Sequence, residues 1–212
     1  MPFLREILPF CGIRAGIWNI TETAAELLSF VQLTEYEKSM YQSFGHDLRK
    51  RQWLAYHALL QHLLAPLTPE ILYDLNGKPF LASGSHHISV SHAGEFAAAI
   101  CAKNIMVGID IEKLKERVER VKERFMLKIE LESLVPENRL ENLLIYWCGK
   151  EALYKLHGKP ELDFRNDIYI HPFDYICNTN HTCKATLTID DCQKDYTLYY
   201  QRIGDYMLVM AY

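Results

Sequence analysis

The chain has 212 residues, a mass of 24.7 kDa and a formal net charge of −4. That length holds one large domain or two small ones, and the hydrophobic fraction of 49% is enough for a core. The negative charge argues against a nucleic-acid binder that relies on bulk electrostatics, but it leaves room for a local basic pocket. No run of 18 apolar residues is present, so we expect no membrane span. A charge pair, Arg5-Glu6, stands where a secretory signal would have its apolar core, so we expect a cytoplasmic protein.

Cysteine and histidine usage points to no structural metal or disulfide. The six cysteines contain no C-x-x-C pair, and in a cytoplasmic chain of this size we interpret them as reduced, buried thiols. Zinc binding through His86-His87 or through His181 and Cys183 is not expected, because neither has a partner at structural-zinc spacing. The cysteines are Cys11, Cys101, Cys148, Cys177, Cys183 and Cys192.

The first part of the chain predicts one strand followed by helices. The clearest helix has an apolar stripe at helical spacing, which we interpret as core, and the prolines at 66 and 69 end it. The expected elements are a strand over residues 11–20, a helix over 24–28 capped by Thr21 or Thr23, a helix beginning at Thr34, and the long helix from Leu48 to Leu64.

The middle of the chain predicts an antiparallel β-meander. Asn76-Gly77 is a turn signal, and three strand-like runs follow it over residues 87–91, 96–102 and 106–112. Gly94 and Lys103-Asn104 supply the turns between these runs.

The last part predicts two helices and then a strand-rich tail. Residues 113–132 are expected to form one highly charged helix, and 140–157 a second helix. Strands are expected over 168–170, 175–177, 185–189, 196–202 and 207–212. The order of elements predicts an α+β fold of two similar halves, residues 1–103 and 104–212, each an antiparallel meander packed with helices.

Two short stretches contain side chains of the types that bind phosphate and metal ions in proteins. Asp110 and Glu112 lie two residues apart in a strand pattern, so both point to the same side, roughly 7 Å apart. Glu151 and Lys155 are four residues apart in a helix pattern and share one face. Three carboxylates from a strand and a helix suit a hard cation that prefers oxygen ligands, and the lysine suits a phosphate that the cation also touches.

Each of these signals is weak when it is taken alone. An Asp-x-Glu on a strand is usually a solvated face, and Glu–Lys pairs on helices are common. Ser91-His92 has the residue types of a hydrolase nucleophile and base, but adjacent strand residues point to opposite faces. The specificity lies in the combination and its order: Gly77-Lys78-Pro79, Ser89-Val90-Ser91-His92, Gly108-Ile109-Asp110-Ile111-Glu112, a looser Arg124-Phe125 with Glu130, and Trp147-Cys148-x-Lys150-Glu151-Ala152-x-x-Lys155.

With these motifs the chain resembles the 4′-phosphopantetheinyl transferases, specifically the surfactin-synthetase-activating type built as two similar halves. The resemblance implies transfer of the phosphopantetheine arm of coenzyme A to a serine of an apo carrier protein, with release of adenosine 3′,5′-bisphosphate. It implies that Asp110, Glu112 and Glu151 bind Mg²⁺ on the pyrophosphate and that Lys155 contacts the phosphate. Glu151 is also a candidate base for the serine hydroxyl.

The resemblance extends to further residues and to partners. It implies that Lys150 adds positive field at the catalytic helix and that Glu130 supports the metal shell. It implies that the coenzyme A site in the first half is built from Arg51, Lys78, Pro79, Ser91 and His92. The expected partners are an acyl carrier protein or a peptidyl or polyketide carrier domain, with the enzyme acting as a monomer and without nucleic acid or membrane.

Two other hypotheses about the function stay open from the sequence. One is a non-catalytic relative that still binds carrier proteins or coenzyme A. The other is an unrelated α+β enzyme that handles a different nucleotide diphosphate. The chain also departs from the family by having Tyr56-His57 where many members have arginine, which weakens any list of contacts to the 3′-phosphate.

Overall fold

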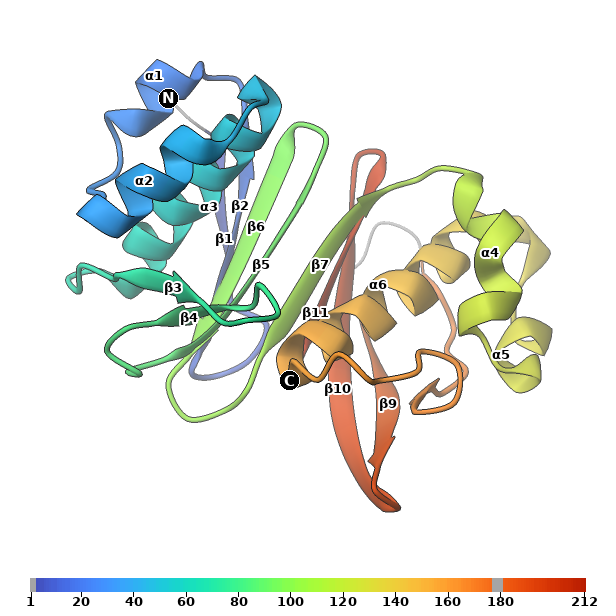
Figure 1. Ribbon diagram of the computed structural model, residues 1–212. Coiled ribbons are helices and arrows are strands. Elements are labelled where there is room, and N and C mark those ends of the chain that lie inside the picture. Colours follow the sequence, from blue (N-terminus) through green and yellow to red (C-terminus); the bar gives the residue numbers. More distant parts are fainter. Residues whose placement is uncertain (1–2, 177–180) are drawn as a thin grey trace. The chain divides into compact units, whose positions relative to one another are not determined.

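The computed structural model describes residues 3–176 and 181–212 and has mixed α and β structure (Figure 1). The chain divides into two compact units, Met1–Met106 and Val107–Tyr212, called unit 1 and unit 2 below. Each unit has its own buried apolar cluster and is described separately. The expected α+β class with antiparallel sheets is confirmed.

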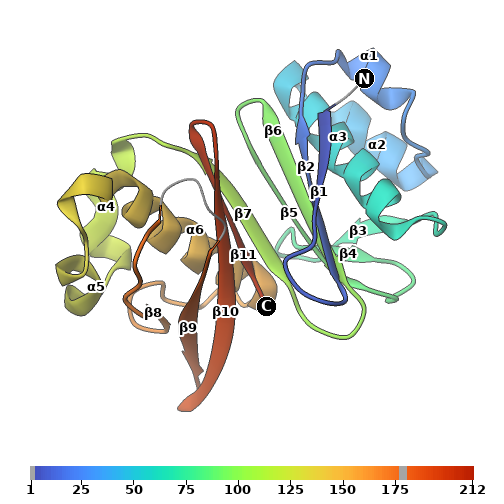
Figure 2. The same cartoon turned by 180° about the vertical axis from the view of Figure 1, so that it is seen from behind.

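Unit 1 packs helices against a four-stranded antiparallel sheet with strand order β1-β2-β6-β5. A separate two-stranded hairpin pairs β3 with β4. Strand β1 was not expected from the sequence; it lies at the edge of this sheet, beside β2, as the view from behind shows (Figure 2). The elements are β1 (Phe3–Ile7), β2 (Ile13–Asn19), α1 (Ala24–Leu28), α2 (Glu35–Ser43), α3 (Asp47–Leu64), β3 (Ile71–Tyr73), β4 (Pro79–Leu81), β5 (His87–Ala93) and β6 (Phe96–Ala102).

The helices of unit 1 begin where the sequence predicts. Thr23 caps α1 and Thr34 caps α2, and each accepts a hydrogen bond from the backbone N–H of a glutamate three residues later. That glutamate reaches back to the N–H of the capping residue, so two helix-end donors are satisfied together. The apolar stripe of α3 is buried against β2 and β6 from Trp53 to Leu64, which confirms its interpretation as core there. Leu48, in the first turn, is exposed and does not belong to the core.

Unit 2 packs its helices on one side of a five-stranded antiparallel sheet with strand order β7-β11-β10-β9-β8 (Figure 1). The long helix α6 crosses the face of this sheet and packs on β7 and β11 (Figure 1). The elements are β7 (Gly108–Lys113), α4 (Arg117–Phe125), α5 (Lys128–Glu132), a 3-10 turn (Pro136–Asn138), α6 (Arg139–His157), β8 (Ile168–Ile170), β9 (His181–Ile189), β10 (Cys192–Ile203) and β11 (Tyr206–Ala211).

Three expectations about the elements were wrong. The third strand of the predicted meander, β7, pairs with β11 and not with β6, because β6 already pairs with β2 on one edge and β5 on the other. The charged segment 113–132 forms two helices, α4 and α5, with extended backbone at Met126 and Leu127. Tyr175 and Ile176 are not in a strand, and Cys177 lies outside the described residues.

For the part of the chain that the structure describes, the interpretation of the cysteines as buried thiols is confirmed for three and is wrong for Cys11 and Cys192, which are exposed. Five free cysteines are found there, three of them buried: Cys101, Cys148 and Cys183. Burial raises the pKa of the Cys101 thiol to about 11, which keeps it protonated at neutral pH. None of the described helices is long and apolar enough to cross a bilayer.

The two units follow one plan. In each, the first strand of the plan (β2 or β7) pairs with the last (β6 or β11), which pairs with the strand before it (β5 or β10). In each, one long helix (α3 or α6) packs on that sheet and is preceded by a short helix (α2 or α5). The plan places β7 and α6 of unit 2 face to face, and the acidic motifs lie on these two elements.

Candidate active site

Two glycines let α6 lie unusually close to the sheet of unit 2. A Cβ at Gly108 would lie 1.9 Å from the backbone oxygen of Ala152, so only glycine fits where β7 meets α6. A Cβ at Gly149 would lie 2.8 Å from Cδ1 of Ile170 and 2.8 Å from Cδ1 of Leu198. Glycine inside a helix costs about 1 kcal/mol relative to alanine, and close approach is the reason for it here.

This close approach brings the acidic strand and the catalytic helix of the prediction together. Asp110 and Glu112 lie on β7, with Asp110 buried and Glu112 half-buried. The Lys155 Nζ, one turn beyond Glu151 on α6, donates to Asp110 Oδ1 at 2.6 Å and to the backbone oxygen of Ile109 at 3.3 Å. Two motifs about 40 residues apart in sequence therefore form one site.

The carboxyl groups of this site repel one another. Burial, followed by repulsion from Asp110, raises the pKa of Glu151 to about 7. The pKa of Glu112 is also raised, by burial first and by Asp110 second, while Lys155 lowers the pKa of both. Three carboxyls thus share one ammonium, which leaves the group with excess negative charge.

Such a donor set suits a hard cation, which prefers carboxylate oxygens. Within residues 3–176 and 181–212, no group of three His, Cys, Asp or Glu side chains is placed so that it could hold a metal ion as it stands. Instead the Lys155 ammonium lies against Asp110. The donor types and the excess charge fit a divalent ion, and Asp110, Glu112 and Glu151 are the residues that would hold it.

Lys150 occupies a different place from the one expected. Its side chain is fully buried, and its ammonium donates to Glu130 Oε2 at 2.9 Å and to the backbone oxygens of Phe164 and Ile168 at 2.9 and 2.7 Å. All three N–H bonds therefore have acceptors inside unit 2. This geometry does not support the expected role of Lys150 as a source of positive field for the reacting phosphate.

Glu130 likewise lies apart from Asp110, Glu112 and Glu151, which are called the acidic group below. Its Oε2 accepts the N–H of Leu127 at 2.7 Å, which caps α5, and its Oε1 accepts the N–H of Ile170 at 2.8 Å. Both oxygens are occupied and the residue is fully buried. The contacts give Glu130 a role in holding α5, β8 and α6 together in place of the predicted role in the metal shell.

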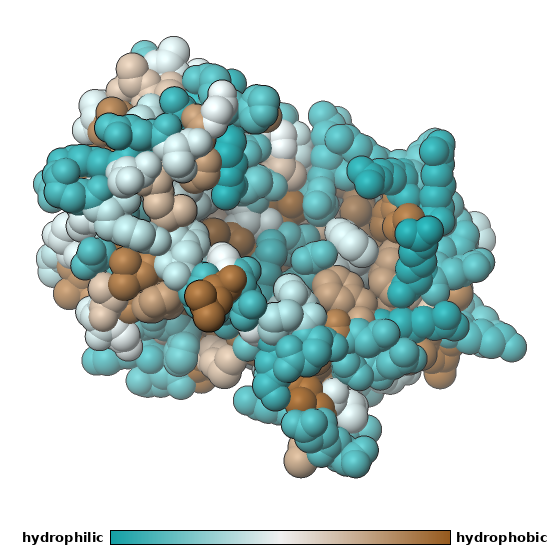
Figure 3. Space-filling view, in the orientation of Figure 1, coloured by the Kyte–Doolittle hydropathy of each residue, from teal (hydrophilic) through white to brown (hydrophobic). Residues whose placement is uncertain are grey.

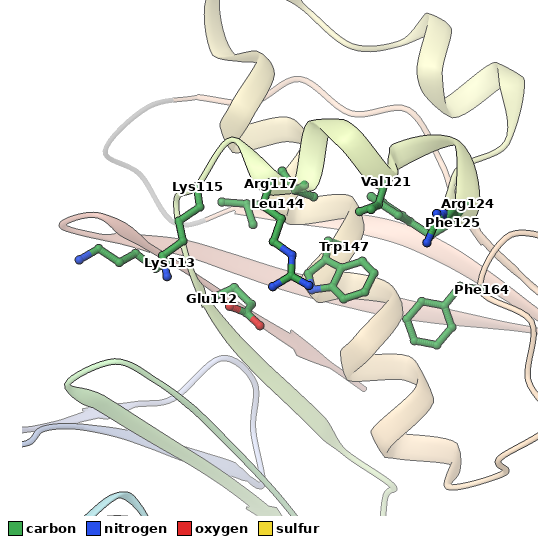
Figure 4. Close-up of a pocket in the computed structure, with 11 residues that line it drawn as sticks. Glu112, Lys113, Lys115, Arg117, Val121, Arg124, Phe125, Leu144, Trp147 and Phe164 are labelled. Carbon is green, nitrogen blue, oxygen red and sulfur yellow. The ribbon is translucent and has the colours of Figure 1, made fainter. Parts of the chain in front are cut away.

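A cavity of about 590 Å³ opens beside Glu112 within unit 2. Its floor is apolar, and Trp147 there packs on the rings of Phe125 and Phe164. Figure 4 shows Arg117 pointing from α4 toward Glu112 and Trp147. In the space-filling view, apolar surface lies between hydrophilic side chains next to α4 (Figure 3). The cavity is lined by Glu112, Lys113, Lys115, Arg117, Val118, Val121, Arg124, Phe125, Leu144, Trp147 and Phe164.

The site residues predicted in unit 1 lie on three of its elements. Lys78 and Pro79 follow the turn between β3 and β4, and burial lowers the pKa of Lys78. Ser91 and His92 are consecutive on β5, which confirms that they point to opposite faces.

Sequence reasoning missed Arg49, which lies beside His92. The Arg49 Nη1 contacts His92 Nε2, whereas Arg51 pairs with Asp47 one turn earlier on α3 at 2.8 Å. Positions 49 and 51 are about 200° apart around a helix, so they face different ways. The sequence does contain Arg49 two positions before Arg51, but it does not show which of the two arginines faces β5.

Comparison with known proteins shows the family of this chain. Residues 106–208 match the family model of the 4′-phosphopantetheinyl transferase superfamily, a range that covers the Asp110 and Glu151 motifs. A relative, 4′-phosphopantetheinyl transferase AcpT of Escherichia coli strain K12, is 35% identical over 151 residues, which cover 68% of this chain and 71% of the relative. The chain belongs to the 4′-phosphopantetheinyl transferase superfamily.

Other members of the superfamily are similar at lower identity. AcpT of Salmonella typhi is 29% identical over 154 residues, which cover 70% of this chain and 73% of that protein. The 4′-phosphopantetheinyl transferase psf-1 of Bacillus pumilus is 28% identical over 151 residues, which cover 66% of this chain and 64% of that protein. The resemblance inferred from the motifs is confirmed at the level of the superfamily.

Proposed function

We propose that this superfamily member transfers the 4′-phosphopantetheine arm of coenzyme A to a serine of an apo acyl, peptidyl or polyketide carrier protein. The serine oxygen forms a bond to the phosphorus of the arm, the pyrophosphate bridge breaks, and adenosine 3′,5′-bisphosphate leaves. The observation that carries the proposal is the group of Asp110, Glu112, Glu151 and Lys155 on β7 and α6, in a chain of this superfamily. The two-half, surfactin-synthetase-activating type is the subtype we propose.

The acidic group and Lys155 have complementary tasks in this reaction. A Mg²⁺ held by the three carboxylates would neutralise the diphosphate and make its phosphorus open to attack. Lys155 would then exchange its contact with Asp110 for a phosphate oxygen and stabilise the departing nucleotide. Glu151, on the α6 face that meets β7, is the candidate to accept the serine proton.

Unit 1 is proposed to hold the nucleotide end of coenzyme A. Lys78 and the Arg49–His92 pair supply basic groups suited to the 3′-phosphate. Ser91 and Pro79, on neighbouring elements, are kept as contacts to the same end. Arg51 is a weaker candidate than Arg49, because its guanidinium pairs with Asp47.

The cavity beside Glu112 is proposed to receive the carrier protein. Its rim carries Lys113, Lys115, Arg117 and Arg124 against a single acidic residue, so it favours a partner with an acidic face. Its apolar floor suits an apolar side chain of that partner. A segment seated there would lie next to Glu112, and its serine would therefore be near the acidic group.

Mass spectrometry tests the reaction directly. Candidate apo carrier proteins incubated with the enzyme, coenzyme A and Mg²⁺ should each gain the mass of one phosphopantetheine when they are substrates. An apo carrier whose serine is replaced by alanine is the matched control and should gain nothing. Binding of coenzyme A without any mass gain across acyl, peptidyl and polyketide carriers would favour a non-catalytic relative instead.

A further inference from the structure

Glu130 and Lys150 form a buried clamp that ties three elements of unit 2 together. The Glu130 carboxylate accepts backbone N–H groups from Leu127, at the start of α5, and from Ile170, on β8. The Lys150 ammonium joins that carboxylate to α6 and also binds two backbone oxygens before and in β8. Both side chains are fully buried, so solvent does not weaken these bonds.

Unit 1 contains the same arrangement in a weaker form. The Glu37 carboxylate accepts the N–H of Thr34, at the start of α2, and the N–H of Ile71, on β3. His57 of the long helix α3 takes the place of the lysine, with its Nδ1 3.6 Å from Glu37 Oε1. The residue numbers of the glutamates, and those of the long-helix partners, both differ by 93.

The two clamps differ in how firmly they hold the long helix. The 3.6 Å separation exceeds a hydrogen bond, and burial lowers the pKa of His57 to about 3, so the imidazole is neutral and forms no ion pair. Lys150, in contrast, donates three hydrogen bonds of 2.7–2.9 Å. The helix with the firm clamp is the one that carries Glu151.

Stability alone does not explain a buried ion pair at this position. Replacing such a pair with well-packed apolar residues is often neutral or stabilising, because desolvation of two charges offsets their attraction. At Gly149, α6 has no side chain that could interdigitate with Ile170 and Leu198. The neighbouring Lys150 therefore supplies the hydrogen bond that ties this part of α6 to β8.

We propose that Lys150 is a positioning residue, whose ammonium fixes the rotation of α6 and so holds Glu151 toward Asp110 and Glu112 on β7. Successive helix residues are about 100° apart, so fixing the direction of Lys150 fixes that of Glu151. Misplacement of a reacting group by about 1 Å can cost 10²-fold in rate. The proposal rests on the proposed transfer reaction for its kinetic test, but not for its structural one.

The test uses the double variant Glu130→Gln/Lys150→Met, which removes both buried charges and leaves neither stranded. Either single change leaves one buried charge unpaired and should lower the melting temperature strongly. The double variant should melt closer to the wild type, yet its kcat should stay reduced by about 10²-fold. Its affinity for coenzyme A, measured by calorimetry, should be unchanged. Recovery of kcat together with the melting temperature would show that the pair is only structural and would overturn the proposal.

A matched control and a milder variant guard against simple loss of folding. His57→Gln disturbs the corresponding clamp of unit 1 and should lower the melting temperature without lowering kcat, because α3 carries no carboxylate of the acidic group. Glu130→Asp keeps both charges but draws the carboxylate back by one methylene. It should stay folded and lose about tenfold in kcat, as a fraction of the full misplacement effect. A wild-type kcat for Glu130→Asp would count against the proposal.

A crystal structure of a folded variant gives a readout that needs no activity. In the double variant, or in Glu130→Asp, the Glu151 carboxylate should be displaced from its wild-type position relative to Glu112. An unchanged position would overturn the positioning role. Absence of phosphopantetheine transfer by the wild-type protein would contradict only the proposed function, so the two failures can be told apart.

Discussion

The three carboxylates of unit 2 have uncharged counterparts in unit 1. Both first strands, β2 and β7, pair with the last strand of their own unit, and both long helices pack on that pair. Shifting by the 93 residues that separate the two clamps gives the counterparts: Ile17 for Asp110, Asn19 for Glu112 and Ala58 for Glu151. Unit 1 therefore builds the same local structure without the acids, so the fold does not require them.

The comparison separates the features that both units share, called the frame below, from those that we assign to the chemistry of the reaction. The glutamate clamp, the long helix and the strand pair occur in both units, so they belong to the frame. Among the residues that the structure describes, the acidic group, Lys155 and the close approach at Gly108 are features of unit 2. The unit 1 counterpart of Gly108 is Ala15. What is special to unit 2 is therefore what we assign to catalysis, and the predictions below test this division.

Removing Asp110 should have the largest effect. Asp110→Ala should lower the transfer rate on the order of 10³-fold, because it removes a carboxylate from the proposed cation site, where the cation would neutralise the diphosphate. Its thermal unfolding should change little, because unit 1 folds with an apolar residue at the same place. Asn19→Ala, at the unit 1 counterpart of Glu112, is the matched control and should keep full activity. An Asp110→Ala enzyme that is fully active at ordinary Mg²⁺ would remove the basis for the acidic site.

Exchanging the glycine and alanine at the strand–helix contact tests the close approach. Gly108→Ala would place a Cβ against the backbone of Ala152, so α6 must move away. We expect a loss of about 1–3 kcal/mol in the free energy of unfolding, as in other overpacked cores, and at least a tenfold lower kcat. The reciprocal Ala15→Gly should cost only about 0.5–1 kcal/mol, from backbone entropy, and leave kcat unchanged. Equal kinetic effects of the two changes would mean that the spacing at Gly108 is not special to catalysis.

The two arginines of α3 should differ in their effect on coenzyme A. Arg49→Ala should raise the KM for coenzyme A about tenfold, which corresponds to one charge-assisted contact, while kcat changes less. Arg51→Ala should have a smaller effect, because its guanidinium pairs with Asp47. With dephospho-coenzyme A, which lacks the 3′-phosphate, Arg49→Ala and the wild type should have the same KM. A larger effect at Arg51 would restore the original expectation for that residue.

The smallest effect concerns stability against pH. The pKa of His57 is about 3 in the folded protein and about 6.5 when unfolded, so the unfolded state takes up the proton first as the pH falls. The free energy of unfolding should therefore be full above pH 6.5 and fall below it by about 1.4 kcal/mol per pH unit from this residue. Urea unfolding at pH 7.5 and 5 should show about 2 kcal/mol less pH dependence in His57→Gln than in the wild type. Identical pH dependence in both proteins would show that His57 is not buried as a neutral group.

Local patterns predicted most of the elements but not all of their partners. The caps at Thr23 and Thr34, the long helices and the hairpin turns follow from short-range chemistry, and the structure has them there. The pairing of β7 with β11 depended on β6 already having a partner on each edge. Local sequence patterns do not show which strand edges are occupied. The break between α4 and α5 depends on Glu130 capping Leu127, a contact that competes with continued helix.

The acidic motifs were visible in the sequence because spacing alone puts their side chains on one face. The burial of Lys150 could also have been predicted from the sequence. Lys150 has the helical spacing of the buried stripe that contains Tyr146, Gly149 and Leu153, on the core side of α6. A charged residue in a core stripe signals a buried partner, and family resemblance drew attention to its neighbour Glu151 instead. Arg49 was missed because proximity to His92 depends on how α3 lies against β5.

The most direct test of the division between frame and chemistry is Glu151→Gln, with coenzyme A affinity and single-turnover transfer measured on the same preparation. The change removes the charge and keeps the shape. We predict a transfer rate lower by about 10²-fold to 10⁴-fold. Coenzyme A affinity should stay near that of the wild type, because the contacts that we propose for the nucleotide lie on α3, β5 and the β3–β4 turn. A variant that loses coenzyme A binding while turning over at the wild-type rate at saturation would contradict this account.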